Sequence, residues 1–424
     1  MDDACQLDAK ATARRATELV ARRSYGKLVA FLAARSRDLA AAEDALADAF
    51  AAALAEWPRG CPANPEAWLL TVARRKLIDG ARRQRSGEAA LEHWQWIADE
   101  VDAADDDAAI PDQRLALMFA CTHPAIDAGV HAPLMLQTVL GLDAKRIASA
   151  FLTSPAAMSK RLVRAKDKIR QAGIPLRVPE REELGTRLSG VLEAIYAAFT
   201  DGWSDPGGAD TGRSDLTEEA LFLARLAAGL LPREPEALGL LACLLHAHAR
   251  RCARRNVDGD YVPLTEQDTA RWDAAMIDEA EALLRRACRQ GRIGRYQLEA
   301  ALQSVHAERR CGAGVNWTAA LQLYDALATL TDSPVVAINR ALAIAELRGA
   351  EAALAELPDL AADARLGEYQ PYWATRADLL ARAGRAHEAQ AAYAIAIGLE
   401  SDEAVRRFLR GRQDACAHGP TGGG

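Results

Sequence analysis

Basic side chains gather on one predicted helix in the first quarter of the chain. Residues 74–85 contain the bases Arg74, Arg75, Lys76, Arg82, Arg83 and Arg85, against the single acid Asp79. Arginines along one side of a helix suit contacts with phosphate groups, because each neutralised phosphate releases condensed counterions. A solvated basic face explains one such helix equally well, so a second basic helix would favour the phosphate interpretation.

A second basic helix is predicted from Pro155 to Gln171. It carries Lys160, Arg161, Arg164, Lys166, Lys168 and Arg170, whereas Met158, Leu162, Val163 and Ile169 recur at helical spacing and are expected to face a core. A short predicted helix at 144–151 and a tight turn at Thr153-Ser154 come before it. This order is typical of a helix-turn-helix, whose second helix enters the major groove of DNA.

The position of each residue along this helix predicts its role. A recognition helix contacts base edges near its N-terminus and phosphates further along. This rule predicts that Ser159, Lys160 and Val163 contact base edges. It predicts that Arg161, Arg164 and Lys168 contact phosphates. Two DNA-binding modules on one chain would hold each other at high effective concentration near two separated DNA elements.

Motifs of bond chemistry are missing from the sequence. It contains no nucleotide-hydrolysis loop, no G-x-G-x-x-G and no H-E-x-x-H. Its eight cysteines are scattered singly, without a C-x-x-C pair, which indicates thiols rather than disulfides. Cys243, His246, His248 and Cys252 lie close together, but their offsets of 3, 5 and 9 do not share one helix face. We therefore predict a protein that is not an enzyme, with no metal site and no cofactor.

Three predicted helices, 13–36, 39–57 and 65–85, would position the first basic cluster. The middle helix has an acidic outer face, formed by Glu43, Asp44, Asp48 and Glu56. Asn64-Pro65-Glu66 has the form of a helix cap followed by proline at the first helical position.

Charge divides the chain into a basic front and an acidic rear. Residues 1–178 carry 25 bases and 23 acids, and nine of those acids lie in residues 88–112, which hold no base. Without that acidic linker the net charge of residues 1–178 is +11, whereas the net charge of residues 179–424 is −9. This asymmetry favours a front that binds a polyanion and a rear that does not.

Length and composition indicate two to four helical domains. The chain has 424 residues, half of them apolar, with few aromatics. The N-terminus is acidic and polar, and no apolar run approaches the roughly 20 residues needed to cross a bilayer. We therefore expect a cytoplasmic protein that does not bind membranes.

Beyond residue 180 the sequence predicts paired helices. Gly349 and Gly384 each end or interrupt a helical pattern, 35 residues apart. That spacing fits the period of about 34 residues of tetratricopeptide repeats. We expect a repeat domain at 179–412 and a disordered tail at 413–424.

Several ordered motifs resemble the extracytoplasmic-function group of RNA polymerase sigma factors, in the branch with a C-terminal tetratricopeptide-like extension. The matching stretches are 42–45 (AEDA), 64–74 (NPEAWLLTVAR), 161–166 (RLVRAK), 168–175 (KIRQAGIP), 266–268 (EQD), 271–273 (RWD), 296–298 (YQL) and 333–341 (SPVVAINRA). The resemblance covers nearly the whole chain. It implies an all-α fold, with sigma region 2 at 1–87, an acidic linker at 88–112 and sigma region 4 at 113–178.

The resemblance also implies partners and roles. Core RNA polymerase would be bound by Asp44, Asp48 and Phe50. The promoter −10 element would be contacted by Asn64, Arg74, Arg75, Arg82 and Arg83, and the −35 element by the helix from Pro155. The linker would run through polymerase. The partner of the repeat domain would be a protein or a small molecule.

Two positions depart from the family pattern. Many relatives have Asn where this chain has Arg75, near the flipped −10 base, so the −10 preference is open. The usual Phe-Asn-Glu-Gly-Tyr at the end of the first extension helix is Phe199-Thr200-Asp201-Gly202-Trp203 here.

Three functions compete at this point. The leading one is a sigma factor that directs promoter-specific initiation and is regulated in cis by its acidic repeat domain. The second is a helix-turn-helix regulator with a ligand- or protein-binding repeat domain. The third is a peptide-binding scaffold with solvated basic helices, which predicts no salt-dependent DNA affinity.

Overall fold

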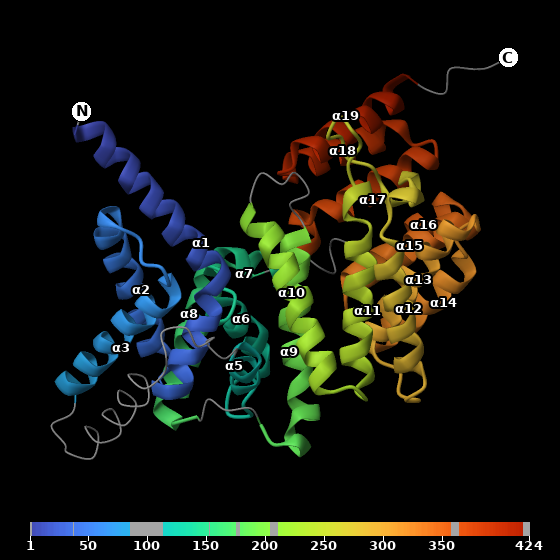
Figure 1. Cartoon of the computed structure of the whole chain (residues 1–424). Coiled ribbons are helices and arrows are strands. Elements are labelled where there is room, and N and C mark those ends of the chain that lie inside the picture. Colours follow the sequence, from blue (N-terminus) through green and yellow to red (C-terminus); the bar gives the residue numbers. More distant parts are fainter. Residues whose placement is uncertain are drawn as a thin grey trace. The chain divides into compact units, whose positions relative to one another are not determined.

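The computed structural model describes residues 2–36, 38–84, 113–151, 153–174, 179–203, 211–357 and 364–418. These ranges are helical and contain no strand; an isolated bridge pairs Arg255 with Tyr261 (Figure 1). The all-α prediction is therefore confirmed. The acidic linker at 88–112 lies outside the described residues. Of the tail expected to be disordered at 413–424, residues 413–418 are instead the end of a helix, and the last six residues lie outside the described residues.

The described residues form two compact units. The first contains residues 1–202 and 215–223, and the second contains 203–214 and 224–424. The first unit thus includes most of the helix that follows residue 180, although that helix was expected to belong to the repeat domain.

The first unit begins with three helices, α1 (Asp2–Ser36), α2 (Leu39–Glu56) and α3 (Pro65–Gln84), which we call the first module. Their starts follow local capping rules. The Asp38 side chain accepts a hydrogen bond from the backbone N–H of Ala41, and Asn64 does the same for Ala67. Leu28, Leu46 and Leu69 are fully buried where the three helices meet.

Four further helices form the second module: α5 (Arg114–Cys121), α6 (Ala128–Thr138), α7 (Ala144–Ala150) and α8 (Pro155–Ala172). Ser154 caps α8 through the N–H of Ala157, and Pro155 takes the first helical position. Gly173 ends the helix with φ 59°, a left-handed conformation that favours glycine. The sequence predicted both ends of α8 within one residue.

The next helices, α9 (Arg181–Trp203) and α10 (Thr211–Leu230), contribute to the first unit. A Cβ on Gly190 of α9 would lie 3.1 Å from Thr122 Cγ2 and 3.2 Å from His131 Cβ, so glycine allows α9 to approach the second module closely. Arg114 of α5 forms an ion pair with Glu219 of α10.

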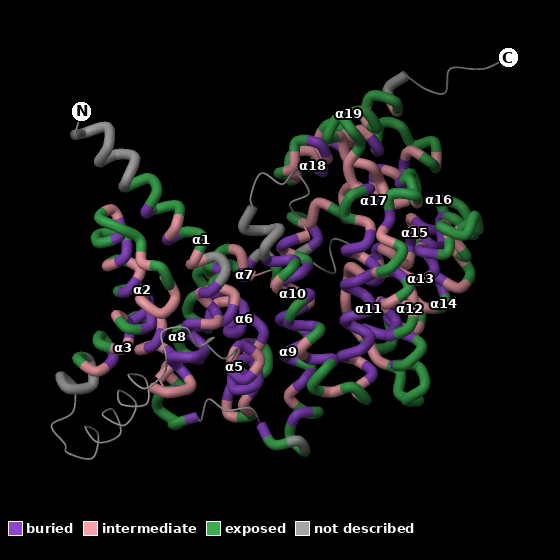
Figure 2. Tube along the Cα trace, in the orientation of Figure 1, coloured by how far each residue is buried: buried purple, intermediate pink, exposed green. Residues whose placement is uncertain are grey.

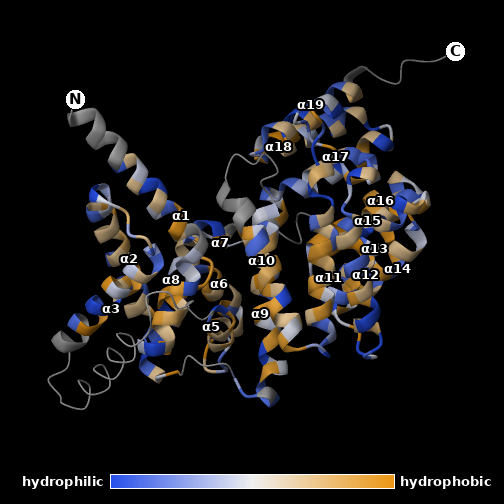
Figure 3. Cartoon of the chain, in the orientation of Figure 1, coloured by the Kyte–Doolittle hydropathy of each residue, from blue (hydrophilic) through white to orange (hydrophobic). Residues whose placement is uncertain are grey.

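The second unit is built on α11 (Pro235–Ala249), α12 (Ala274–Cys288) and α13 (Arg295–Ala307). α11 is largely apolar (Figure 3). It is buried on nearly all sides (Figure 2), because α12 and α13 both pack against it. A Cβ on Gly239 of α11 would lie 2.7 Å from the backbone nitrogen of Gln297, so only glycine fits without a shift.

Each remaining helix packs against the next along the chain: α14 (Trp317–Leu330), α15 (Pro334–Arg348), α16 (Ala350–Glu356), α17 (Gln370–Arg382), α18 (Ala386–Leu399) and α19 (Glu403–His418). Gly349 and Gly384 have φ of 88° and 76° and lie in the turns α15–α16 and α17–α18. Gly312, with φ 77°, lies between α13 and α14, 37 residues before Gly349. The spacing of turns therefore extends one unit further toward the N-terminus than the sequence indicated.

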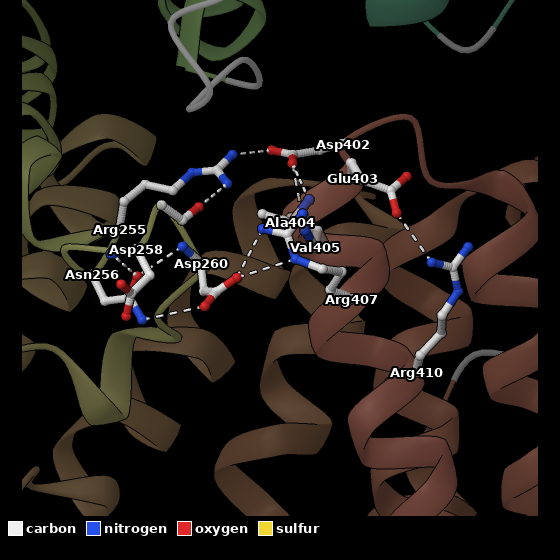
Figure 4. Close-up of polar contacts among 11 residues, drawn as sticks. Arg255, Asn256, Asp258, Asp260, Asp402, Glu403, Ala404, Val405, Arg407 and Arg410 are labelled. Carbon is white, nitrogen blue, oxygen red and sulfur yellow. Dashed lines mark hydrogen bonds and ion pairs between the residues drawn. The ribbon is translucent and has the colours of Figure 1, made fainter.

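The last helix returns to the beginning of the second unit (Figure 4). Arg255, in the loop after α11, forms an ion pair with Asp402, and Arg407 of α19 donates to Asp260 of the same loop at 2.8 Å. The Tyr261 and Phe408 rings meet edge to face at 5.4 Å. We call this set of contacts, which joins residues 255–261 to 402–408, the clasp.

Candidate nucleic-acid interface

One face of α8 is open to solvent and carries the six predicted DNA-contacting residues: Ser159, Lys160, Arg161, Val163, Arg164 and Lys168. The opposite face is buried through Met158, Leu162, Ala165 and Ile169. The expectation that Val163 faces the core is wrong, since 57% of its surface is exposed. Its placement beside Ser159 and Lys160 on the open face suits a base reader, because an apolar side chain can contact the thymine methyl group.

Lys166 departs from the other bases of α8. It follows Leu162 by four residues and precedes Ile169 by three, so it lies on the buried side of the helix. Its Nζ lies 2.7 Å from Glu43 Oε2 on α2. Helical spacing could have excluded Lys166 from the open face, but nothing in the sequence identified Glu43 as its partner.

The predicted −10 residues are distributed over different surroundings on the first module. Asn64 and Arg75 are exposed, whereas Arg74 is half-buried with its guanidinium 5.2 Å from the centre of the Phe31 ring. Arg82 and Arg83 belong to the last turn of α3, but their side chains lie outside the described residues. The structure therefore places Asn64 and Arg75 at solvent and turns Arg74 toward α1.

The loop before α3 is held by aromatic packing. Trp57 is buried and meets Trp68 edge to face at 5.6 Å. At the start of α3, Glu66 accepts hydrogen bonds from Ser24 and from Lys27, the latter at 3.3 Å. These contacts fix α3 on α1. Ser24 and Lys27 belong to no motif, so nothing in the sequence indicated this role.

The predicted polymerase-contacting residues lie along α2. Asp44 and Asp48 are exposed, and Phe50 is half-buried. Asp48 lies 3.5 Å from Lys76 of α3, in an exposed ion pair worth little energy. Burial raises the pKa of the neighbouring Glu43 carboxyl, although Lys166 acts in the opposite direction.

Two residues of the segment 199–203, which departs from the family pattern, are held by arginines. Asp201, near the end of α9, forms an ion pair with Arg146 of α7. Trp203 accepts a hydrogen bond at its carbonyl from Arg254 at 2.7 Å, and the Arg254 guanidinium lies 4.2 Å from the centre of its ring. Burial lowers the pKa of Arg254 to about 10.

The described residues contain no group of three or more His, Cys, Asp or Glu side chains arranged to hold a metal ion. Cys243 is buried, Cys252 is exposed, and His246 lies 3.4 Å from Glu281. Among all the residues that the structure describes, no helix is both long and apolar enough to cross a membrane.

Comparison with known proteins matches two parts of the chain. The family model of sigma-70 region 2 matches residues 20–87, and a model described as a family of unknown function (DUF6596) matches residues 187–288. A protein of Rhizobium meliloti (strain 1021), named "Uncharacterized protein R00370", is 40% identical over 391 residues, which cover 91% of this chain and 92% of that protein. No solved structure matches. The chain therefore carries a sigma-70 region 2 on α1–α3.

Proposed function

Since the chain belongs to one family with the Rhizobium meliloti protein and carries a sigma-70 region 2, we propose that it is a sigma factor of the extracytoplasmic-function type. It binds core RNA polymerase and directs it to particular promoters in the cytoplasm. Sigma-70 region 2 supports the role in transcription initiation. The chain supplies no bond chemistry of its own, because polymerase performs the catalysis.

The observation that carries the proposal is the open face of α8 in a chain that begins with region 2. Lys160, Arg161 and Arg164 project to solvent on a helix whose other side is buried. In this proposal α8 reads the −35 element while α3 contacts the −10 element. Capture of unstacked bases by the first module then offsets the cost of unpairing the DNA.

Run-off transcription with core polymerase tests the proposal. We expect a promoter-dependent transcript only when this protein and core polymerase are both present. Combining Lys160→Ala with Arg164→Ala should abolish most of that transcript, whereas Lys10→Ala combined with Arg15→Ala, a charge-matched control at two exposed positions of α1, should not. Absence of a transcript from every upstream region tested would contradict the proposal.

The second candidate is a helix-turn-helix regulator that acts without polymerase, and the open face of α8 would serve it as well. Removal of residues 1–87 discriminates between the two. A regulator of this kind keeps its affinity for duplex DNA, whereas a sigma factor loses polymerase binding altogether.

The C-terminal unit is the regulator in our proposal. Residues 179–424 together carry a net charge of −9, opposite to that of the DNA-binding modules, and the second unit itself (203–214 and 224–424) carries −3. Its helical turns, spaced by 35 and 37 residues, support a tetratricopeptide-like architecture that binds a protein or a small molecule.

A further inference from the structure

The two modules of the first unit pack against each other. α1 contacts α5, and α2 contacts α8. The central polar contact is the ion pair of Lys166 with Glu43, whose side chains are only 18% and 14% exposed. Loss of one member of such a pair leaves the other charge poorly solvated, so a substitution that breaks the pair is more costly here than at an exposed pair.

Two glycines bring the backbones of the modules close. A Cβ on Gly26 of α1 would lie 1.7 Å from the carbonyl oxygen of Val139, at the end of α6. A Cβ on Gly141 would lie 3.3 Å from the ring of Tyr25, and Gly141 has φ 67°. Tyr25 is half-buried there, and desolvation by burial, with Glu43 and Asp44, raises its pKa to about 12. Both contacts require residues without side chains.

This packing conflicts with simultaneous binding of both promoter elements. Elements centred at −35 and −10 are about 25 base pairs apart, or roughly 85 Å along the DNA. Modules in direct contact cannot reach both. The 29 residues between Gln84 and Arg114 would reach at most about 100 Å if extended, so chain length alone permits separation.

We propose that the contact formed by Tyr25, Gly26 and Glu43 with Val139, Gly141 and Lys166 is an autoinhibitory latch. The latch holds the modules in a closed state that must open before both promoter elements are bound. This inference rests on the proposed function and adds a regulation to it. The open state is the binding-competent one, so its small population lowers the apparent affinity for polymerase and promoter.

Hydrogen exchange on the full chain tests the latch directly. Lys166→Glu places two acids face to face, and we expect exchange at residues 136–142 and 24–30 to accelerate about tenfold. The double variant Lys166→Glu with Glu43→Lys restores the pair in reverse and should restore slow exchange. Lys145→Glu, an exposed site on α7, makes the same charge change without touching α2 and should leave exchange unchanged.

Binding to core polymerase tests the regulation with the same variants. We expect Lys166→Glu to bind several-fold more tightly than the native chain, and the double variant to return to the native affinity. Unchanged exchange in Lys166→Glu would overturn the latch. Faster exchange confined to those segments without tighter binding would overturn its inhibitory role. If no variant, including the native chain, bound polymerase, the proposed function would fail while the exchange result still decided whether the modules are latched.

Discussion

The exposed side chains of α8 divide into those that would read sequence and those that would supply charge. Val163 and Ser159 are exposed near the beginning of the helix, and Arg161 and Arg164 lie among them. A phosphate contact contributes to affinity for any sequence, whereas a base contact contributes only at its own base pair. Substitutions can therefore separate the two roles.

Arg161→Ala should weaken DNA binding by a similar factor on all sequences and make the dependence of log affinity on log salt shallower by about 0.9. Val163→Ala should weaken binding only to the preferred −35 sequence and leave the salt dependence unchanged. Titrations of duplex DNA at several salt concentrations measure both. Lys10→Ala serves as the charge-matched control, and a change in slope for that variant would contradict the assignment.

A half-buried imidazole in the second unit, that of His306, should make the stability of this unit sensitive to acid. Burial, with Arg250 and Arg309, lowers the pKa of His306 from 6.5 to about 4. The unfolded chain therefore takes up the proton first as the pH falls. Stability is fully present above pH 6.5 and is lost as the pH falls toward 4, by up to about 3 kcal/mol for this one group.

His306→Phe should flatten that part of the profile of unfolding free energy against pH, and it keeps a ring against Trp317, which lies 5.8 Å away. Chemical denaturation at pH 7, 6, 5 and 4 measures the effect. His387→Phe, at an exposed position on α18, is the control. Equal acid sensitivity in the native chain and His306→Phe would show that this group does not contribute.

Helices and their ends were predictable because their signals are local. Ser154, Pro155 and Gly173 delimit α8 through capping and backbone conformation. The open face of α8 followed from helical spacing, except at Val163, which is apolar yet exposed. The partnership of Lys166 with Glu43 was not predictable, because it joins residues 123 positions apart through tertiary packing alone. The close approach of Gly190 to Thr122 and His131 was not predictable either, because it too depends on tertiary packing.

Close packing between α11 and α13 gives a test at the level of helices. Gly239→Ala should lower the free energy of unfolding of the second unit by about 1–3 kcal/mol, because the new methyl group meets the backbone of Gln297. Gly398→Ala in α18 meets nothing within 4 Å and should be neutral or stabilising by up to about 1 kcal/mol. Urea denaturation compares them, and equal stability of the two variants would contradict the close fit.

At the scale of the whole molecule, the division between the units guides truncation. A fragment ending at residue 178 lacks α9, which packs on Thr122 and His131, and lacks Glu219, the partner of Arg114. We expect that fragment to melt at a lower temperature than a fragment ending at residue 223. Compared with the full chain, the longer fragment should also give a different level of transcription from the same promoter. Equal melting temperatures would show that α9 and α10 contribute no stability to the modules.

The clasp alters how the second unit can come apart. A helical array with loose ends frays from either end, because each repeat touches only its neighbours. Here Asp402 and Arg407 tie the final helix to Arg255 and Asp260, next to the first helices of the array. Fraying at either end must first break those ties. A proteolytic cut or a bulky fusion near the carboxyl terminus would consequently disturb helices that lie some 150 residues earlier in the chain.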